Sequence, residues 1–230
     1  MLPEVIPVLP GGPWEPVGER LRRRGVVVVA GPVAEWARPG TRPGRHVLAR
    51  TVGAVLGIDP EAVGLGRSPG GRPYVRAPAA PDISLSHTRH VVVAALSTYG
   101  RIGVDVEGRA RKLYGGPIVD AMTTRRERTA LLPLSPAAGN ACLVRLWTLK
   151  EAYAKALGVG TRLPFTAFGF HGLRGGGGRS RPALHGADGT PAEPAEQERW
   201  ELSVPDDCVP GHVVSWAVRG TRPGDSGLSP

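Results

Sequence analysis

The stretch Ile102-Gly-Val-Asp105-Val-Glu107 says more about the fold than any other part of this chain. Apolar residues at every second position predict a β-strand, because the side chains of a strand alternate between its two faces. The isoleucine and the valines then share one face, and the two carboxylates share the other, roughly 7 Å apart along the strand. Two like charges on one face are unfavourable unless something neutralises them, and a hard cation with oxygen ligands would do so. The alternative is a plain edge strand whose acidic face lies in water.

Further strands are predicted on both sides of this stretch. Residues 26–29 are four valines and residues 91–96 are all apolar, as expected of buried strands. Residues 83–86 form a short strand, so that residues 83–107 are expected to be paired strands with short connections. Residues 165–170 are also expected to form a strand, and residues 200–204 and 212–218 are expected to form two closing strands.

Two amphipathic helices are predicted, at residues 45–56 and 141–157, the second of which ends at Gly158. Residues 118–132 are expected to form a third. The chain has 33 glycines and 24 prolines, which favours irregular segments. The segments expected to be irregular are residues 1–24, the polar loop 172–195 and a mobile tail at 220–230.

The helix at 141–157 carries a second group of polar residues, in the sequence Trp147-Thr-Leu-Lys-Glu151-Ala-Tyr-Ala-Lys155. Trp147, Glu151 and Lys155 follow one another at intervals of one turn, so they share a face. Glu151 is a candidate third metal ligand or proton acceptor, and Lys155 is a candidate phosphate contact. The alternative is an ordinary Glu–Lys pair on the helix surface.

Two loop segments supply further candidates. Residues 84–88 read Ser-Leu-Ser-His-Thr, and the hydroxyl, imidazole and amide groups of Ser86 and His87 are suited to holding a phosphate. A turn whose hydroxyls satisfy local backbone groups is the alternative. A serine hydrolase is not favoured, because no G-x-S-x-G elbow surrounds either serine. In Gly71-Arg-Pro-Tyr, Arg72 offers a planar fork for phosphate, although a surface turn also fits this stretch.

Composition narrows the class of partner. Twenty-nine Lys and Arg against twenty Asp and Glu give a formal charge of +9, which favours an anionic partner. Nucleic acid is one such partner, but the three Phe and four Tyr are scattered rather than interleaved with basic residues. The two cysteines lack metal-ligand spacing and favour an intracellular protein. We see no secretory signal, and the apolar runs are too short to span a membrane.

Taken together, these segments resemble the 4′-phosphopantetheinyl transferases of the surfactin-synthetase type. The resemblance rests on four motifs in a fixed order: G-[KR]-P-Y, S-x-S-H-[ST], G-[IV]-D-[IVL]-E and W-[ST]-x-K-E-[AS]-x-x-K. They occupy residues 71–74, 84–88, 103–107 and 147–155. The resemblance implies a fold of the α/β (α+β) class, built as a pseudo-twofold pair of similar α/β subdomains with the ligand cleft between them. The N-terminal subdomain is expected at 1–104, the C-terminal subdomain at 105–219 and a flexible tail at 220–230.

The resemblance also implies the chemistry and the site. The expected reaction moves the 4′-phosphopantetheine arm of coenzyme A to a serine of an acyl or peptidyl carrier protein, with Mg²⁺ as cofactor. The implied metal ligands are Asp105, Glu107 and Glu151, and the implied catalytic residues are Asp105, Glu151 and Lys155. The implied coenzyme A contacts are Arg42, Arg45, Arg72, Ser86, His87 and Lys155. Glu127, in the place of the family's S-x-x-E segment, is expected to support the metal site.

The resemblance gives the positive charge a partner, because carrier proteins of this class are usually acidic. A monomeric, cytoplasmic enzyme is expected, with no nucleic acid or membrane partner. A catalytically inactive coenzyme A binder is a further alternative, against which the joint presence of Asp105, Glu107, Glu151 and Lys155 argues.

Overall fold

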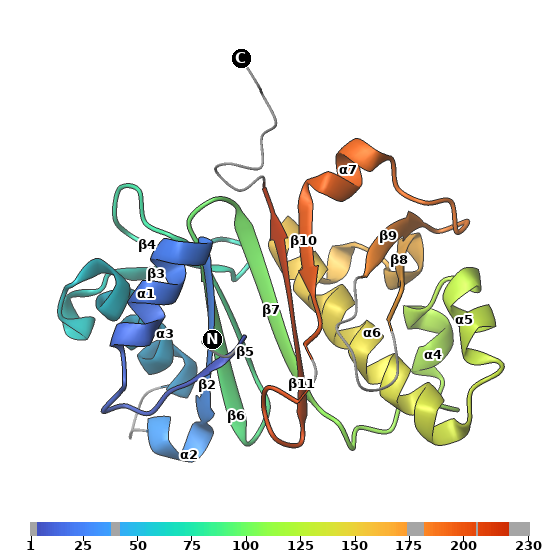
Figure 1. Ribbon diagram of the computed structural model, residues 1–230, viewed down its shortest axis with the longest axis horizontal. Coiled ribbons are helices and arrows are strands. Elements are labelled where there is room, and N and C mark those ends of the chain that lie inside the picture. Colours follow the sequence, from blue (N-terminus) through green and yellow to red (C-terminus); the bar gives the residue numbers. More distant parts are fainter. Residues whose placement is uncertain (1–3, 38–41, 174–181, 206, 221–230) are drawn as a thin grey trace.

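The computed structural model describes residues 4–37, 42–173, 182–205 and 207–220, and it shows a layered α/β protein (Figure 1). Helices α1 and α3 cover one side of a four-stranded sheet. A three-stranded sheet follows, and helix α6 covers its far side. The hairpin β8–β9 and the short helices α4 and α5 lie beyond α6 (Figure 1). The predicted mixed α/β class is confirmed.

The elements divide into two halves. The first contains β1 (Ile6–Pro7), α1 (Glu15–Arg24), β2 (Val26–Pro32), α2 (Val33–Trp36), α3 (Pro43–Leu56), β3 (Leu65–Arg67), β4 (Pro73–Val75), β5 (Asp82–His87) and β6 (Val91–Ser97). The second contains β7 (Arg101–Gly108), α4 (Ile118–Met122), α5 (Arg125–Leu131), α6 (Pro136–Leu157), β8 (Phe168–His171), β9 (Ala183–Gly186), α7 (Pro194–Glu198), β10 (Trp200–Ser203) and β11 (His212–Arg219). Three 3₁₀ turns are η1 (Pro60–Ala62), η2 (Gly160–Arg162) and η3 (Phe165–Ala167).

The two halves have the same topology. In the first, β2 is followed by α3, the hairpin β3–β4 and then β5 and β6, and β6 lies between β2 and β5. In the second, β7 is followed by α6, the hairpin β8–β9 and then β10 and β11, and β11 lies between β7 and β10. Neighbouring strands in both triplets are antiparallel. The element order therefore supports the expected pseudo-twofold pair, and the second half begins with β7. The division after residue 104 stays a prediction.

Three apolar layers hold these elements together. One lies between α1, α3 and the first sheet, and another between the two sheets. The valines of β2 show why both layers form: Val27 and Val29 face the helices, whereas Val26 and Val28 face the second sheet. A strand buried on both faces reads as a continuous apolar run, as the four valines of the sequence do.

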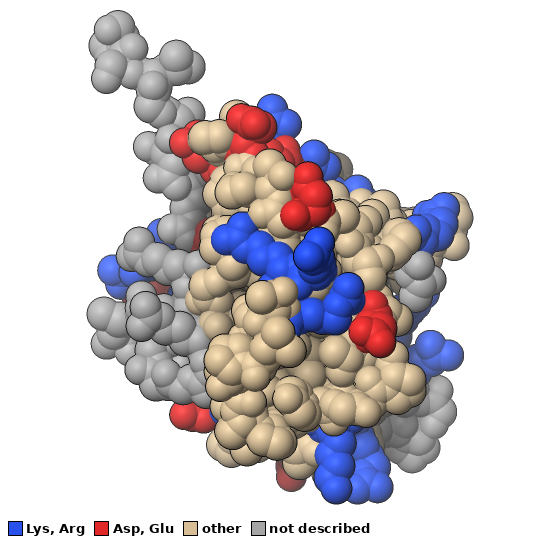
Figure 2. Space-filling view, turned by 90° about the vertical axis from the view of Figure 1, so that its right-hand side faces the viewer, with Lys and Arg blue, Asp and Glu red and all other residues tan. Residues whose placement is uncertain are grey.

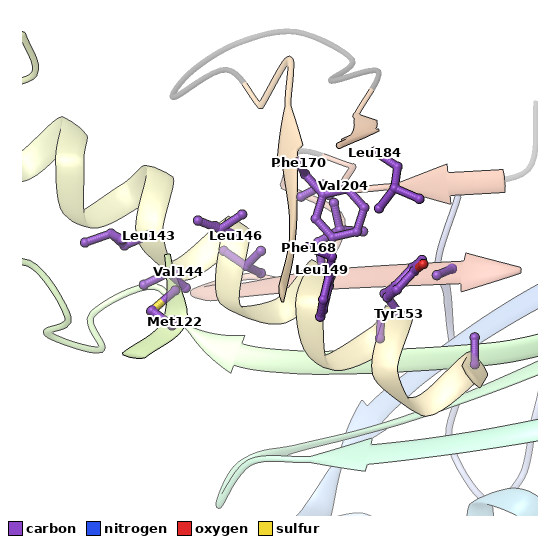
Figure 3. Packing of buried hydrophobic residues seen from close by; sticks show 14 of the residues in the cluster. Met122, Leu143, Val144, Leu146, Leu149, Tyr153, Phe168, Phe170, Leu184 and Val204 are labelled. Carbon is purple, nitrogen blue, oxygen red and sulfur yellow. The ribbon is translucent and has the colours of Figure 1, made fainter. Parts of the chain in front are cut away.

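The third layer surrounds α6. Ser135 caps this helix by accepting a hydrogen bond from the amide of Ala138, Pro136 occupies the first turn, and Gly158 ends the helix in the left-handed region. Its apolar side meets the aromatic residues of β8, including Phe168 and Phe170 (Figure 3). The helix is thus held between the second sheet and the β8–β9 hairpin, which fixes the positions of its polar residues.

Several expectations about local structure were wrong. Residues 1–24 contain α1, whose buried residues Val17 and Leu21 are spaced one turn apart. The helix expected at 118–132 is two helices, because Thr124 caps α5 in a reciprocal capping box with Glu127. Helix α6 begins at Pro136, five residues before the predicted start at residue 141.

The expected pairing of strands within residues 83–107 holds only in part. Strand β5 pairs with β6, but β7 pairs with β11, which comes more than 100 residues later in the chain. The segment 172–195, expected to be a loop, contains β9 and the start of α7, and its residues 174–181 lie outside the described part of the chain. The expected tail at 220–230 lies outside it from residue 221 onward.

Candidate functional site

The acidic face of β7 is covered by α6, and a glycine makes this possible. A Cβ atom at Gly103 would lie 1.8 Å from the carbonyl oxygen of Ala152 and 2.6 Å from the amide nitrogen of Ala156. The helix backbone therefore rests directly on the strand. Glu151 and Lys155 flank this crossing point, and Asp105 lies two residues along the strand from it. The alternative of an acidic face in water is wrong for Asp105, which is 6% exposed.

Asp105 is the centre of a buried polar cluster. Its Oδ1 accepts hydrogen bonds from Lys155 Nζ at 2.6 Å and from Ser86 Oγ at 2.7 Å. Lys155 Nζ also donates to the carbonyl of Val104 at 3.0 Å. Asp105 Oδ2 is buried and has no hydrogen-bond partner among the described residues. The structure thus brings together Asp105, Lys155 and Ser86, which are three of the predicted site residues, from three different elements.

Glu107 is paired within its own segment. Arg111 donates to its carboxylate, and the Arg111 guanidinium lies 4.5 Å from the ring centre of Trp147. Burial raises the pKa of Glu107 above its ordinary value, although the charge of Arg111 opposes this. Trp147 packs edge-on against Phe165, with ring centres 5.5 Å apart.

Glu151 lies close to the carboxylates of Asp105 and Glu107. Burial raises its pKa, and the negative charge of Asp105 raises it further. Among the described residues, no three acidic, histidine or cysteine side chains converge closely enough to form a metal centre. The three-carboxylate arrangement of Asp105, Glu107 and Glu151 therefore stays a prediction.

Arg72 points away from open solvent and toward the protein. Its guanidinium donates to the Asp82 carboxylate, to the carbonyl of Ile102 at 2.7 Å and to the carbonyl of Lys155. Burial lowers the pKa of Arg72, and the charge of Asp82 opposes that shift. The side chain bridges the two halves, and its place as a direct phosphate contact stays a prediction.

A broad basic groove opens on the first half of the molecule. It has a volume of about 1140 Å³ and is lined by α3, the β3–β4 hairpin and the end of β5. No acidic residue is found among its described lining residues, which include His87 and five arginines: Arg42, Arg45, Arg67, Arg76 and Arg89. Ser86 and His87 are consecutive residues at the end of β5, so their side chains point to opposite faces of the strand, with the Asp105 cluster on one face and the groove on the other. The structure thus brings Arg42, Arg45 and His87 together.

Positive charge is also found away from this groove. Figure 2 shows Lys and Arg side chains across the middle of the face formed by the outer elements of the second half, with acidic side chains gathered above them. Arg125 and Arg126 are exposed on α5, which lies on this side (Figure 1). The basic residues behind the net charge of +9 are therefore found at more than one place on the surface, and not in the groove alone.

The buried ion pair of Lys150 and Glu127 holds the helix that carries the site, and this pair was not predicted from the sequence. Lys150 Nζ donates to Glu127 Oε2 at 2.8 Å and to the carbonyls of Met122, Phe165 and Phe168. Glu127 also accepts hydrogen bonds from the amides of Thr124 and Phe170. Glu127 therefore anchors the helix that carries Glu151. The capping-box pattern from Thr124 to Glu127 is the sequence signal that could have indicated a structural role.

Comparison with known proteins links this site to a family. The model of the 4′-phosphopantetheinyl transferase superfamily matches residues 101–207, the segment that carries Asp105, Glu107, Glu151 and Lys155. The resemblance stated from the motifs is thereby confirmed at the level of the superfamily, and the surfactin-synthetase type stays a prediction.

Individual relatives agree with this assignment. The chain is 32% identical over 127 residues to a 4′-phosphopantetheinyl transferase of Bacillus subtilis, covering 53% of this chain and 54% of that protein. It is 28% identical over 120 residues to the 4′-phosphopantetheinyl transferase HetI of Nostoc sp. (strain PCC 7120), covering 51% of each. The matches thus span about half the length of these two transferases.

A solved structure is also similar in part. The holo-[acyl-carrier-protein] synthase of Thermotoga maritima matches with a TM-score of 0.37 and 22% identity, covering 55% of this chain and 67% of that one. Within the described residues, no helix is both long enough and apolar enough to cross a membrane.

Proposed function

We propose that this protein transfers the 4′-phosphopantetheine arm of coenzyme A to a serine hydroxyl of a carrier protein. The observation that carries the proposal is the joining of Asp105, Lys155 and Ser86 in one buried cluster within a superfamily segment. The basic groove on the opposite face of the end of β5 supports the same proposal, because the donor carries several phosphates.

The reaction joins the serine oxygen of the carrier to the β-phosphorus of coenzyme A. The bond from that phosphorus to the bridging oxygen breaks, and adenosine 3′,5′-bisphosphate leaves with the electron pair. The serine proton passes to the Glu151 carboxylate, directly or through a water molecule. Burial raises the pKa of Glu151, which makes this carboxylate a better proton acceptor than an exposed one.

Lys155 neutralises the charge that develops on the phosphoryl oxygens. Its ammonium has three N–H donors, of which Asp105 and the Val104 carbonyl use two. The side chain is 29% exposed, so the third donor is open to a phosphate oxygen. Asp105 fixes the ammonium, and Ser86 fixes Asp105. Positioning and charge neutralisation of this kind are the main sources of catalysis in phosphoryl transfer.

The donor's adenosine bisphosphate portion fits the groove. Arginine binds phosphate through paired hydrogen bonds, and five arginines line the groove together with His87. We assign Arg42, Arg45 and His87 to the 3′-phosphate and the pyrophosphate. Apolar lining residues such as Leu48 and Leu85 offer a surface for the adenine ring.

The acidic residues fit a hard divalent cation by their chemistry. Among the described residues, the buried Oδ2 of Asp105 lacks a hydrogen-bond partner, and burial, followed by the negative charge of Asp105, raises the pKa of the neighbouring Glu151. A cation held by Asp105, Glu107 and Glu151 would relieve this repulsion, although the three carboxylates would have to converge more closely than they do in the described part of the chain. Mg²⁺ bound there would neutralise charge on the pyrophosphate. In the structure, Glu107 is bound to Arg111, so its carboxylate would have to be shared between the two.

The site is tested by removing its carboxylates. Asp105→Ala and Glu151→Ala are each expected to abolish transfer to an apo carrier protein, followed by intact mass spectrometry, while circular dichroism shows a folded protein. Wild-type transfer rates in either folded variant would refute the assigned site.

The groove is tested separately by isothermal titration calorimetry with adenosine 3′,5′-bisphosphate. Arg45→Met is expected to weaken binding about tenfold or more, since hydrogen bonds to charged groups contribute roughly 1.5–3 kcal/mol. Arg23→Met is the matched control, because the Arg23 side chain is 71% exposed on α1, outside the groove. Equal affinity in all three proteins would refute the assignment of the groove.

A further inference from the structure

The free edge of β7 is closed by side chains instead of by another strand. Strand β7 lies at the edge of its sheet, and β5 lies at the edge of the other. Alternate residues of β5 reach across: Asp82 accepts from the amide of Ile102 at 2.7 Å, and Ser84 accepts from the amide of Val104 at 3.1 Å. The next alternate residue is Ser86, which bonds to Asp105. Backbone groups at an edge need partners of this kind when they are buried.

The carbonyl groups of the same edge are bound by two cations. Arg72 donates to the carbonyl of Ile102, and Lys155 donates to the carbonyl of Val104. Arg72 therefore binds the carbonyl of Ile102 in the same way that Lys155 binds the carbonyl of Val104, two residues further along the strand. Its guanidinium also donates to Asp82, so that Arg72 and Asp82 together hold both backbone groups of Ile102.

Arg72 connects this edge to the end of α6 as well. It donates to the carbonyl of Lys155 in the last turn of that helix. The last carbonyls of a helix carry partial negative charge and bind cations favourably. The same guanidinium thus contacts the backbone of Lys155 and the strand that carries the partner of Lys155.

We propose that Arg72 and Asp82 form a clamp that positions Lys155 against Asp105. The proposal rests on the proposed transferase function, and it gives Arg72 the role of a positioning residue in place of a direct phosphate contact. Two observations support it: the guanidinium is turned onto three protein groups, and Arg72 is not among the residues that line the basic groove. A substitution of Asp82 distinguishes a positioning role of Arg72 from a direct phosphate contact, because a carboxylate has no favourable contact with a phosphate.

The clamp also ties the donor groove to the reacting centre. Arg72 precedes Pro73 of β4, and Pro73 and Arg67 of the β3–β4 hairpin line the groove. The clamp therefore holds one wall of the groove at a set distance from Lys155. A displacement of about 1 Å at a reacting group can lower the rate about a hundredfold.

The test compares Arg72→Met, Arg72→Lys, Asp82→Asn and the double variant Arg72→Met/Asp82→Asn with wild type. Arg23→Met is the control, because it removes an exposed Arg–Glu pair on α1. Three quantities are measured: kcat and KM for coenzyme A, the Kd of adenosine 3′,5′-bisphosphate, and hydrogen exchange in the last turn of α6.

The clamp predicts a loss of kcat with little change in binding. Arg72→Met is expected to lower kcat about a hundredfold and to leave the Kd of the bisphosphate within about threefold. Exchange at the end of α6 is expected to rise. The double variant is expected to lose no more than about threefold beyond Arg72→Met, because residues of one network are not additive. Arg23→Met is expected to match wild type in all three.

Arg72→Lys keeps the proposal testable even if the methionine variant fails to fold. Lysine retains the charge but lacks the planar fork that reaches three acceptors. It is expected to bind the bisphosphate normally and to react about tenfold more slowly. A wild-type kcat in folded Arg72→Lys, or a tenfold weaker Kd in Arg72→Met with kcat unchanged, would overturn the clamp alone. Failure of the wild type to transfer would instead refute the proposed function and, with it, the catalytic role of the clamp.

Discussion

Replacing Gly103 by alanine should separate α6 from β7 and so disable the site. An added Cβ would lie 1.8 Å from the carbonyl oxygen of Ala152, where an ordinary contact needs about 3.4 Å, so the helix would have to move by about 1.6 Å. Both atoms in conflict belong to backbone, which cannot rotate away as a side chain can. Overpacking of this kind costs about 1–3 kcal/mol. We expect Gly103→Ala to reach or exceed the upper end of that range.

The same movement should have a larger effect on the reaction than on stability. Lys155 and Asp105 are 2.6 Å apart across the crossing point, and a shift of the helix by about 1.6 Å would break that contact. We therefore expect the transfer rate to fall by about a hundredfold or more, even at temperatures where the variant is fully folded.

Gly108→Ala is the matched control for this experiment. Gly108 ends the same strand, and a Cβ atom there would meet nothing within 4 Å. Urea unfolding gives the stability of each variant, and transfer to an apo carrier protein gives the rate. If Gly103→Ala and Gly108→Ala had the same unfolding free energy and the same rate, the close contact of strand and helix would be refuted.

Three further outcomes are expected. Lys150→Met should destabilise the protein by about 3–5 kcal/mol in urea unfolding, since it leaves the buried carboxylate of Glu127 without its cation; a loss below about 1 kcal/mol would contradict this. Burial raises the pKa of Cys208 to about 11, so native Cys208 should react with iodoacetamide at pH 8 at least about a hundredfold more slowly than in the unfolded chain; equal rates would contradict the burial. Burial and Asp105 raise the pKa of Glu151, so ionisation of Glu151 lowers stability as pH rises above the usual carboxyl range. Without metal, Glu151→Gln should therefore melt higher than wild type at pH 7 and alike at pH 4, and identical melting curves at pH 7 would contradict the shift.

The elements that carry the site were predictable because their signals are local. The alternation at residues 102–107 and the helical spacing from Trp147 to Lys155 each lie within one element, and both elements are present. The grouping of Asp105 with Lys155 and Ser86 followed only from the order of the family's motifs. Nothing in residues 102–107 alone distinguishes a covered acidic face from a solvated one.

What the sequence could not predict depends on distant parts of the chain. The pairing of β7 with β11 instead of β6 is set by how the two sheets fold over one another. The orientation of Arg72 is set by Asp82 and by carbonyls on two other elements, so a local reading favoured a free phosphate contact. The repeated topology of the two halves was expected only from the family resemblance, because antiparallel triplets of this kind need a pattern of burial and not a particular sequence.

The central claim is tested most directly by the mass of a carrier protein. An apo acyl carrier protein is incubated with this protein, coenzyme A and Mg²⁺, with EDTA in a parallel sample, and intact masses are compared. The account predicts a gain of roughly 340 Da, one phosphopantetheine arm, in the sample with metal and not in the sample with EDTA. An unchanged mass with metal, across several acyl and peptidyl carrier proteins, would contradict the proposed transfer.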